Sequence, residues 1–193
     1  RTLTKLLQTF EHAKRMKTRL KIVPIIETAK AVVEMEAIAS EPRVSGLLLG
    51  AEDLTQDMEI ERTKTGVEIE YPRSKMAYTC KASGIEAIDT PFTDTHDDAG
   101  FDWDARHALQ LGMSGKCAIH PNQIDLINQT FAPSPSQIRY AKRIIEADLQ
   151  AQSVHRGVFS LDGKMVDKPV VERAKKLLEK AARYQLVEVD DNE

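Results

Sequence analysis

KIVPIIETAKAVVEMEAIASEPRVSGLLLGAEDL, residues 21–54, is the stretch around which the rest of the chain is organised. It contains two apolar runs, at 22–26 and 44–49, separated by a segment whose apolar residues recur at helical spacing. Continuous apolar runs are typical of buried parallel strands, and parallel strands must be joined by a crossover connection, usually a helix. The stretch is therefore predicted to form a β-strand, an α-helix and a second, parallel β-strand.

Each of these two predicted strands ends at an acidic residue. Glu27 follows the first apolar run, and Asp53 follows the second, 26 residues later and about one β-α repeat away. The carboxyl ends of neighbouring parallel strands meet at one edge of a sheet, so both carboxylates are expected there. Such a pair suits a metal ion or acid–base chemistry. With no cysteine nearby and no histidine at metal-ligand spacing, the oxygen ligands favour Mg²⁺ over zinc.

A plainer role for the two acids is also open. Side chains at strand-to-helix junctions often cap the following helix or interact with its dipole, so Glu27 and Asp53 could serve only that purpose. Glu52 competes with Asp53 for a place in the site. Neighbours on a strand face opposite ways, so only one of them should point into it.

The strand–helix pattern continues along the chain. Further strands are expected at 85–88 and 116–119, ending at Asp89 and at His120. Helices are expected at 2–17, 72–83, 101–111, 122–131, from the PSPS stretch to about 151, and at 169–184, with a turn or short hairpin around Asp162–Gly163. Four strands, each followed by a helix, predict an α/β fold with a parallel sheet.

Two architectures share this pattern: an open doubly wound sheet and the second half of an eight-stranded barrel. Both place functional residues where strands end, as Glu27, Asp53, Asp89 and His120 do here, so this placement does not decide between them. No G-x-G-x-x-G and no P-loop follows a predicted strand, which weakens the nucleotide-binding form of the open sheet. In the barrel, four strands would precede this chain, in keeping with a sequence that starts on a helix at Arg1.

Composition argues against several kinds of partner. The chain has 193 residues and a net charge of −3, so no basic balance favours nucleic acid or an anionic membrane. The apolar runs are far shorter than a membrane span. Two cysteines, Cys80 and Cys117, are too few for a disulfide framework or a zinc site. A reduced cytoplasmic (or organelle-matrix) protein is expected.

Three further residues are weighed as site candidates. His120, followed by Pro121, could act as a base or contact a ligand, although a lone histidine at such a junction is more often structural. Arg73, near a helix start, could bind an anion, but we expect it on the surface in solvent. Asp167 lies beyond the turn at Asp162–Gly163 and has no obvious local role in the sequence.

Seven stretches together resemble the HpcH/HpaI aldolase and citrate lyase beta subunit superfamily, its acyl-CoA branch in particular. They run in family order over about residues 20–180, and as a set they are specific for the family, though not for the substrate. The stretches are PIIETA (24–29), LLLGAEDL (47–54), YPRSKM (71–76), GIEAIDTPFTD (84–94), GKCAIHPNQI (115–124), NQTFAPSPSQI (128–138) and GVFSLDGKMVDKPVVERAKKLL (157–178).

The resemblance implies a Mg²⁺-dependent lyase on a TIM (β/α)8 barrel, usually a homotrimer. Such enzymes cleave or form a carbon–carbon bond between an acyl-CoA, or acyl-carrier thioester, and a 2-keto acid. The motifs that hold the metal in the family fall on Glu27 and Asp53. The family's acid/base aspartate, supplied by a neighbouring subunit in related malyl-CoA lyases, falls on Asp167. His120 and Pro121 become candidate contacts for the substrate or CoA.

The resemblance also implies how the chain is divided. Residues 1–150 would form the C-terminal portion of the barrel, with about four β-α units. Residues 151–193 would form a helical C-terminal arm that packs on a neighbouring subunit. The family's early arginine motif, which binds the substrate carboxylate or thioester oxygen, has no counterpart in this sequence, so these residues alone are expected to be inactive.

Other activities fit the same residues. A malyl- or citramalyl-CoA thioesterase, or a malate-synthase-like condensing enzyme, would use the same site. A non-catalytic assembly subunit is a different class, and the presence of Glu27, Asp53 and Asp167 argues against it.

Overall fold

The computed structural model describes residues 2–153 and 156–187, and it divides the chain into two compact units at residue 130. The elements of the first unit are α1 (Thr2–Ala13), β1 (Ile25–Ile26), α2 (Ala29–Val33), α3 (Met35–Ala39), β2 (Gly46–Leu49), α4 (Ala51–Asp57), the 3-10 helix η1 (Val67–Ile69), α5 (Glu70–Ser83), β3 (Glu86–Asp89), α6 (Asp98–Leu111), β4 (Gly115–Lys116) and α7 (Asn122–Phe131), whose last residue falls in the second unit. Those of the second are α8 (Pro135–Ser153), β5 (Phe159–Leu161), β6 (Lys164–Val166) and α9 (Lys168–Arg183).

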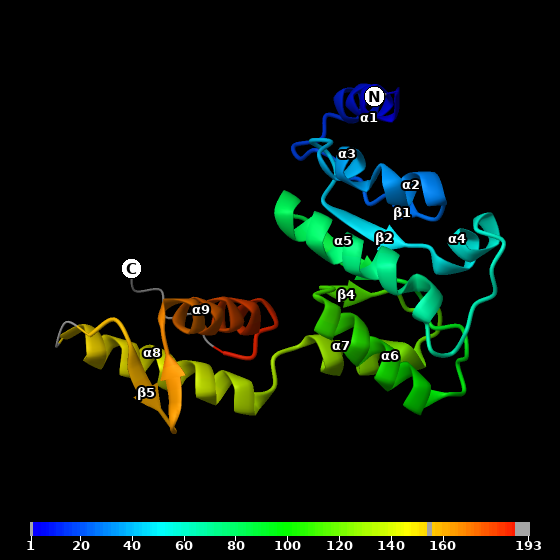
Figure 1. Cartoon of the computed structure of the whole chain (residues 1–193). Helices are drawn as coiled ribbons and strands as arrows, with labels where there is room; N and C mark the ends of the chain where they lie inside the picture. The colour runs from blue at the N-terminus through cyan, green and yellow to red at the C-terminus, as the bar shows by residue number, and fades with distance from the viewer. Residues whose placement is uncertain (1, 154–155, 188–193) are drawn as a thin grey trace. The chain divides into compact units, whose positions relative to one another are not determined.

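The first unit is built on a parallel sheet of four strands in the order β1-β2-β3-β4. Each strand pairs with the next one along the chain, and α5 packs beside β2 and β3 (Figure 1). A doubly wound sheet has a point where its strand order reverses, and these four strands have none. The predicted α/β fold with a parallel sheet is confirmed.

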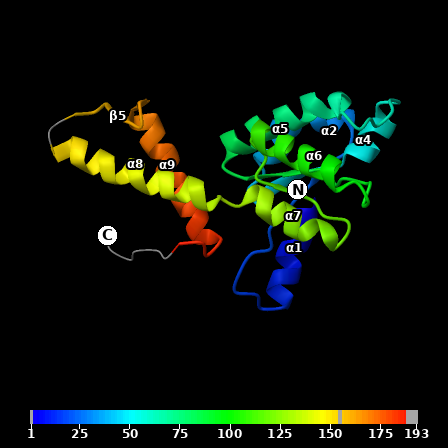
Figure 2. The same ribbon diagram turned by 90° about the horizontal axis from the view of Figure 1, so that it is seen from below.

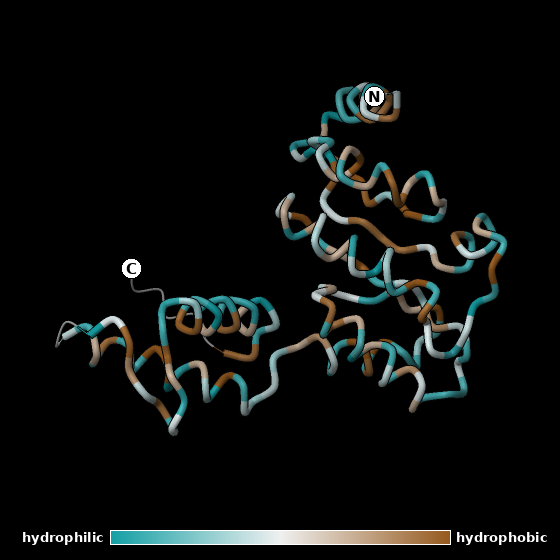
Figure 3. Tube along the Cα trace, viewed as in Figure 1, coloured by the Kyte–Doolittle hydropathy of each residue, from teal (hydrophilic) through white to brown (hydrophobic). Residues whose placement is uncertain are grey.

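The strand register sorts the sheet residues into two faces. Ile26, Leu49, Asp89 and Lys116 lie side by side in register, and all four are buried. The adjacent row points the other way, as successive strand residues do. In that row Ile25 is 50% exposed and Leu48 and Ile88 are partly exposed. Figure 3 shows the brown, apolar colour along β2. One face of the sheet is thus covered by helices, whereas the other is only partly covered.

Helix boundaries follow recognisable end signals. Helix α5 ends at Gly84, which has φ +68° and donates its N–H to the carbonyls of Cys80 and Lys81. That left-handed conformation favours glycine.

The crossover helix expected between the first two strands is broken at Glu34 into α2 and α3. The last strand of the sheet is also shorter and earlier than expected, at Gly115–Lys116 instead of 116–119.

Helix α1 is amphipathic, but none of its residues is buried. A salt bridge holds its C-terminal part to the rest of the unit: Glu11 accepts from Arg43 at 2.6 and 2.9 Å. Glu11 also accepts from the backbone N–H of Leu20 at 2.6 Å. Together these bonds lower the pKa of Glu11 to about 2.

The Glu11 carboxylate gives a test of this anchor. A carboxyl pKa that is lower in the folded state contributes stability above its ordinary value, and this contribution is lost as the pH falls from there towards about 2. We expect Arg43→Ala to raise the pKa of Glu11 back towards about 4.3, measured by NMR titration of the carboxyl carbon. Arg19→Ala is the control, because Arg19 has the smallest share in the shift. An unchanged pKa in Arg43→Ala would contradict this assignment.

The second unit is a helix pair with a β-hairpin. Helices α8 and α9 pack against each other, and α9 crosses behind α8 in Figure 2. Their core contains Ala141, Ile144, Val166, Val171 and Ala174. The predicted turn at Asp162–Gly163 is confirmed: both residues have positive φ, 52° and 74°, as in the tight turns of β-hairpins. No helix among the described residues is long and apolar enough to span a membrane.

Candidate metal site at the strand ends

Glu27 lies at the carboxyl edge of the sheet, directly beside Gly50. Ile26 pairs with Leu49 in the β1–β2 register, and the N–H of Gly50 donates to the carbonyl of Ile26 at 3.0 Å. A Cβ atom built on Gly50 would lie 2.9 Å from Glu27 Cβ and 3.4 Å from its Oε2. The absence of a side chain at Gly50 therefore leaves the space that the Glu27 side chain occupies.

Asp53 lies in the first turn of α4, three residues after Gly50. Its side chain is exposed, whereas Ala51 and Leu54 on the same helix are buried. Because Glu27 lies against Gly50 and α4 begins immediately after it, both acids belong to the same edge of the sheet. The spacing predicted Asp53 at the end of the second strand, whereas the structure places it beyond β2, in α4. That the two acids share one site stays a prediction.

Neither acid caps the helix that follows it. Helix α2 is capped by Thr28, whose side chain accepts from Ala31 N at 3.1 Å, and Asp57 accepts from Ala29 N at 2.8 Å. Helix α4 begins at Gly50, with no side-chain cap bond. Within residues 2–153 and 156–187, no hydrogen bond or ion pair engages the Glu27 or Asp53 carboxylate. Capping by hydrogen bonds is therefore not what the structure shows. The other half of the plainer role, interaction with the helix dipole, does fit Asp53, which lies in the first turn of α4.

Glu52, the competitor of Asp53, is engaged elsewhere. Its carboxylate accepts from Arg62 Nε at 3.0 Å, and Arg62 also forms a short salt bridge to Glu68. The adjacent carboxylate of Asp53 has no such partner within the part of the chain that the structure describes. Asp53 is thus the acid of α4's first turn that remains available to a ligand.

The oxygen ligands that Glu27 and Asp53 offer are of the kind that hard cations such as Mg²⁺ take. Mg²⁺ is commonly held by one or two carboxylates, with water and substrate completing its octahedral shell. No cluster of three or more His, Cys, Asp or Glu able to hold a metal occurs among the described residues, as a closed zinc site would require. The oxygens of Glu27 and Asp53, which have no bonding partner among the described residues, suit an ion that keeps much of its water.

Gly50→Ala tests whether the close approach of Glu27 to Gly50 matters for metal binding. The new Cβ would lie 2.8 Å from Ile25 Cγ2 and 2.9 Å from Glu27 Cβ, well inside a carbon–carbon contact of about 3.5–4.0 Å. We expect Glu27 to be displaced and Mg²⁺ affinity, measured by calorimetry, to fall about tenfold. Gly115→Ala is the matched control, because an added Cβ there meets nothing within 4 Å. Equal Mg²⁺ affinity in both variants would show that the position of Glu27 against Gly50 does not matter for the metal.

A buried cluster of four charged residues lies beneath the strand ends. Arg73 binds Asp89 with two hydrogen bonds of 2.9 Å and Asp104 with one of 2.7 Å. Lys116 donates to Asp89 at 2.7 Å, to Asp104 at 2.5 Å and to the Thr90 carbonyl at 2.7 Å. Two cations and two carboxylates balance in charge. We call Arg73, Asp89, Asp104 and Lys116 the buried ion cluster.

The expectation that Arg73 lies on the surface in solvent is wrong. Its side chain is fully buried. Burial alone would lower the pKa of Arg73, but the charges and hydrogen bonds of Asp89 and Asp104 raise it. Burial would likewise raise the pKa of Asp104, yet the charges of Lys116 and Arg73 lower it. Arg73 and Asp104 are therefore charged near neutral pH, and Asp89 bonds both cations of this cluster.

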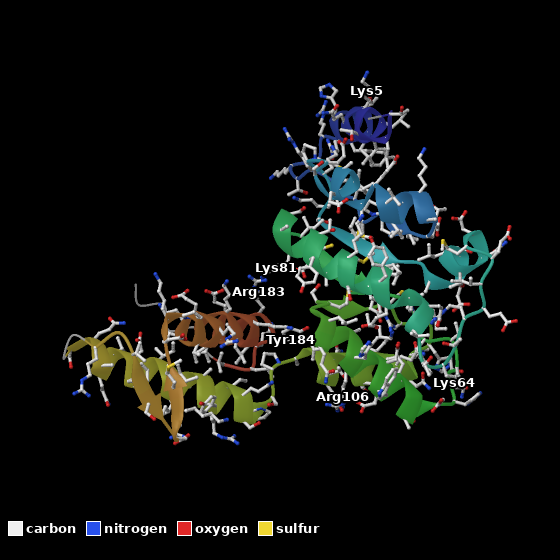
Figure 4. The ribbon with its side chains drawn as sticks, viewed as in Figure 1. Lys5, Lys64, Lys81, Arg106, Arg183 and Tyr184 are labelled. Carbon is white, nitrogen blue, oxygen red and sulfur yellow. The ribbon has the colours of Figure 1, made fainter. Side chains whose placement is uncertain are left out.

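His120 and Pro121 lie in the exposed turn between β4 and α7. His120 Nδ1 is 2.7 Å from Asn122 Oδ1, and Asn122 in turn donates to the Thr95 carbonyl at 3.1 Å. Within the described ranges, no hydrogen bond joins His120 to Glu27 or Asp53. Nearby, Lys64 forms salt bridges to Asp94 and Asp97 (Figure 4). His120 thus pairs with the first residue of α7, and that residue in turn bonds the loop that follows β3.

Asp167 does have a local role, contrary to the expectation from sequence. It is the N-cap of α9, where its Oδ1 accepts from Val170 N at 3.2 Å. Pro169 follows within the first turn of the helix, where a missing N–H is tolerated. The side chain is partly exposed. Asp167 could cap α9 and also act in a neighbouring subunit. Because it has a local role, however, the lack of one no longer supports the intermolecular role.

Comparison with known proteins identifies a family and several relatives of this chain. Residues 1–121 match the HpcH/HpaI aldolase/citrate lyase family. Citrate lyase subunit beta of Haemophilus influenzae is 38% identical over 162 residues, 83% of this chain and 56% of that protein. The human mitochondrial citramalyl-CoA lyase is 31% identical over 170 residues, 83% of this chain and 50% of that protein. The chain spans about half the length of the curated relatives it matches.

A solved structure gives a matching fold. The CitE protein of Mycobacterium tuberculosis, in complex with magnesium, acetoacetate and coenzyme A, superposes with a TM-score of 0.72 at 29% identity. The match covers 87% of this chain and 63% of that one. The family match over residues 1–121, supported by these relatives, shows that the chain belongs to the HpcH/HpaI aldolase/citrate lyase family.

Proposed function

We propose that this chain carries the metal-binding carboxylates of a Mg²⁺-dependent carbon–carbon lyase. Its substrate would be a 3-hydroxyacyl thioester, such as citryl-, malyl- or citramalyl-CoA, cleaved to an acyl thioester and a 2-keto acid. The observation that carries the proposal is that Glu27 and Asp53 share the carboxyl edge of two adjacent strands, with neither engaged as a helix cap. Membership of a family that includes citrate lyase beta and citramalyl-CoA lyase supports the reaction class.

In this proposal Glu27 and Asp53 hold the ion and orient it towards the keto-acid half of the substrate. Bound Mg²⁺ supplies Lewis-acid stabilisation of negative charge on that half's oxygens. Cleavage requires loss of the proton on the 3-hydroxyl, breakage of the bond between the 2- and 3-carbons, and protonation of the thioester's 2-carbon. Asp167 of a neighbouring copy would act as the acid/base group for the protons. His120 and Pro121 would contact the substrate or CoA.

We also propose that the sheet forms part of a TIM barrel. The unreversed strand order and the partly covered second sheet face support a sheet that continues into a closed barrel. In a homotrimeric assembly, residues 151–193 would act as an arm that packs on a neighbouring subunit and brings Asp167 to its site. For the compartment we propose the cytoplasm.

The proposal is tested with a small panel of thioesters in the full natural protein. Citryl-, malyl- and citramalyl-CoA are assayed with and without Mg²⁺, following both keto-acid formation and release of free CoA thiol. A lyase forms keto acid without free thiol, a thioesterase releases free thiol, and an assembly subunit does neither. Keto acid formed only with Mg²⁺ is the expected result. Turnover that persists in EDTA would overturn the metal-dependent mechanism.

A further inference from the structure

Helix α4, which carries Asp53, is held at both ends by hydrogen bonds from outside the helix. At its start, Ala51 N donates to Thr90 Oγ1 at 3.2 Å. At its end, the Asp57 carboxylate accepts from Ala29 N at 2.8 Å. Asp53 lies between these two attachment points. The orientation of this short helix is thus fixed by groups on two other segments.

The first attachment point is anchored by the buried ion cluster. Thr90 is 1% exposed and follows β3 directly. Its carbonyl accepts from Lys116 Nζ at 2.7 Å, and the remaining hydrogen bonds of this ammonium go to Asp89 and Asp104. Thr90 is therefore tied to the sheet through its backbone, while its hydroxyl holds the start of α4.

The second attachment point joins the two segments that carry the carboxylates. Ala29 is two residues after Glu27, and Thr28 between them caps α2. Asp57 is one helical turn after Asp53. The Asp57–Ala29 bond thus links the Glu27 segment directly to the Asp53 helix, so it constrains the separation of the two carboxylates.

We propose that Thr90 and Asp57 are positioning residues that set the spacing of Glu27 and Asp53 for a small cation. The inference rests on the proposed magnesium site. Mg²⁺ demands near-ideal octahedral geometry with bonds of about 2.0–2.1 Å, whereas Ca²⁺ accepts flexible geometry at about 2.3–2.6 Å. Loosening α4 therefore reduces binding of Mg²⁺ more than binding of Ca²⁺, so the two positioning residues determine cation selectivity.

The test compares matched pairs of variants in the full natural protein by calorimetry with Mg²⁺ and with Ca²⁺. Thr90→Val and Asp57→Ala each remove one attachment, and we expect each to weaken Mg²⁺ binding about tenfold and Ca²⁺ binding much less. Thr90→Ser and Asp57→Asn each keep an acceptor oxygen and should restore the selectivity of the unaltered protein. Thr55→Val is the control, because the Thr55 hydroxyl is also buried in α4 but bonds only within that helix.

The outcomes separate this inference from the metal site itself. If Asp53→Ala abolishes Mg²⁺ binding while Thr90→Val and Asp57→Ala bind like the unaltered protein, the positioning roles are wrong and the metal site stands. If the unaltered protein does not bind Mg²⁺, both are wrong. Strong loss in Asp57→Asn would instead make Asp57 a direct ligand, contrary to this inference. Asp57 is exposed, so Asp57→Ala and Asp57→Asn should fold and remain informative even if Thr90→Val does not fold.

Discussion

Asp53→Ala is expected to abolish Mg²⁺-dependent turnover of the full natural protein. The variant removes one of the two protein oxygen ligands proposed for the ion, and the Glu27 carboxylate alone would hold it weakly. Stabilisation of about 4 kcal/mol by a bound metal corresponds to about a thousandfold in rate. The measurement is kcat/KM with the thioester that the panel identifies, over a titration of Mg²⁺.

The neighbouring acid gives a matched control for this variant. Glu52→Ala removes the same charge one residue away, but its carboxylate is an exposed partner of Arg62. Such surface pairs contribute little, about 0–1 kcal/mol, so activity should stay within a few-fold of the unaltered protein. Activity of Asp53→Ala equal to that of Glu52→Ala would remove Asp53 from the metal site.

Lys116→Met is expected to destabilise the first unit strongly. It removes the only cation that bonds Asp89, Asp104 and the Thr90 carbonyl together, within the described residues. The two buried carboxylates are then left with Arg73 alone and a net negative charge. Removal of one partner from a buried ion pair typically costs about 3–5 kcal/mol. We expect a loss of that size in the free energy of unfolding, measured in urea.

The chain provides a local probe and a control for this measurement. Trp103 is the single tryptophan, and it stacks on His107 within the first unit, so its fluorescence follows that unit. Arg106→Met, which breaks the exposed Arg106–Asp102 pair on α6, should change the free energy of unfolding by less than about 0.5 kcal/mol (Figure 4). Similar losses in the two variants would show that the buried ion cluster contributes little.

Acid should reduce the effect of Lys116→Met. The pKa of Asp104 is lowered in the folded protein, so the stability this carboxylate contributes is fully present above its ordinary pKa of about 3.9. It is lost as the pH falls through the lower, folded-state value. The difference in unfolding free energy between the variant and the unaltered protein should therefore be largest near pH 7 and shrink below about pH 4.

The parallel sheet and the placement of its acids could be predicted because they depend on local patterns. Each apolar run identifies a strand, and the connection between two runs forces them to be parallel. Given parallel neighbours, the ends of two strands must share an edge, so Glu27 and the start of α4 lie at the same edge. The length of each strand could not be predicted, because pairing at its ends depends on the neighbouring strand. Strand β4, for example, stops at Lys116 although Cys117–Ile119 continues the apolar pattern.

The buried ion cluster was missed because it depends on tertiary contacts between α5, α6 and the sheet. A charged residue on a helix is usually solvated, and nothing near Arg73 in the sequence identifies its two partners. One signal was present. Arg73 shares helical spacing with Ile69, Met76 and Cys80, all buried, so it lies within the apolar stripe of α5. Asp104 similarly follows Phe101 in the buried stripe of α6.

The unreversed strand order also has a consequence for how the chain folds. The first pair of strands, β1 and β2, is closed by the shortest connection, with partners 23 residues apart, against 40 for β2–β3 and 27 for β3–β4. Loop-closure entropy makes the first pairing about 0.5 kcal/mol cheaper than the second. Glu27 follows β1, and α4 with Asp53 follows β2. The two strands that precede these acids are thus joined at the lowest entropic cost, whereas the attachment of α4 to Thr90 and the buried ion cluster also need β3.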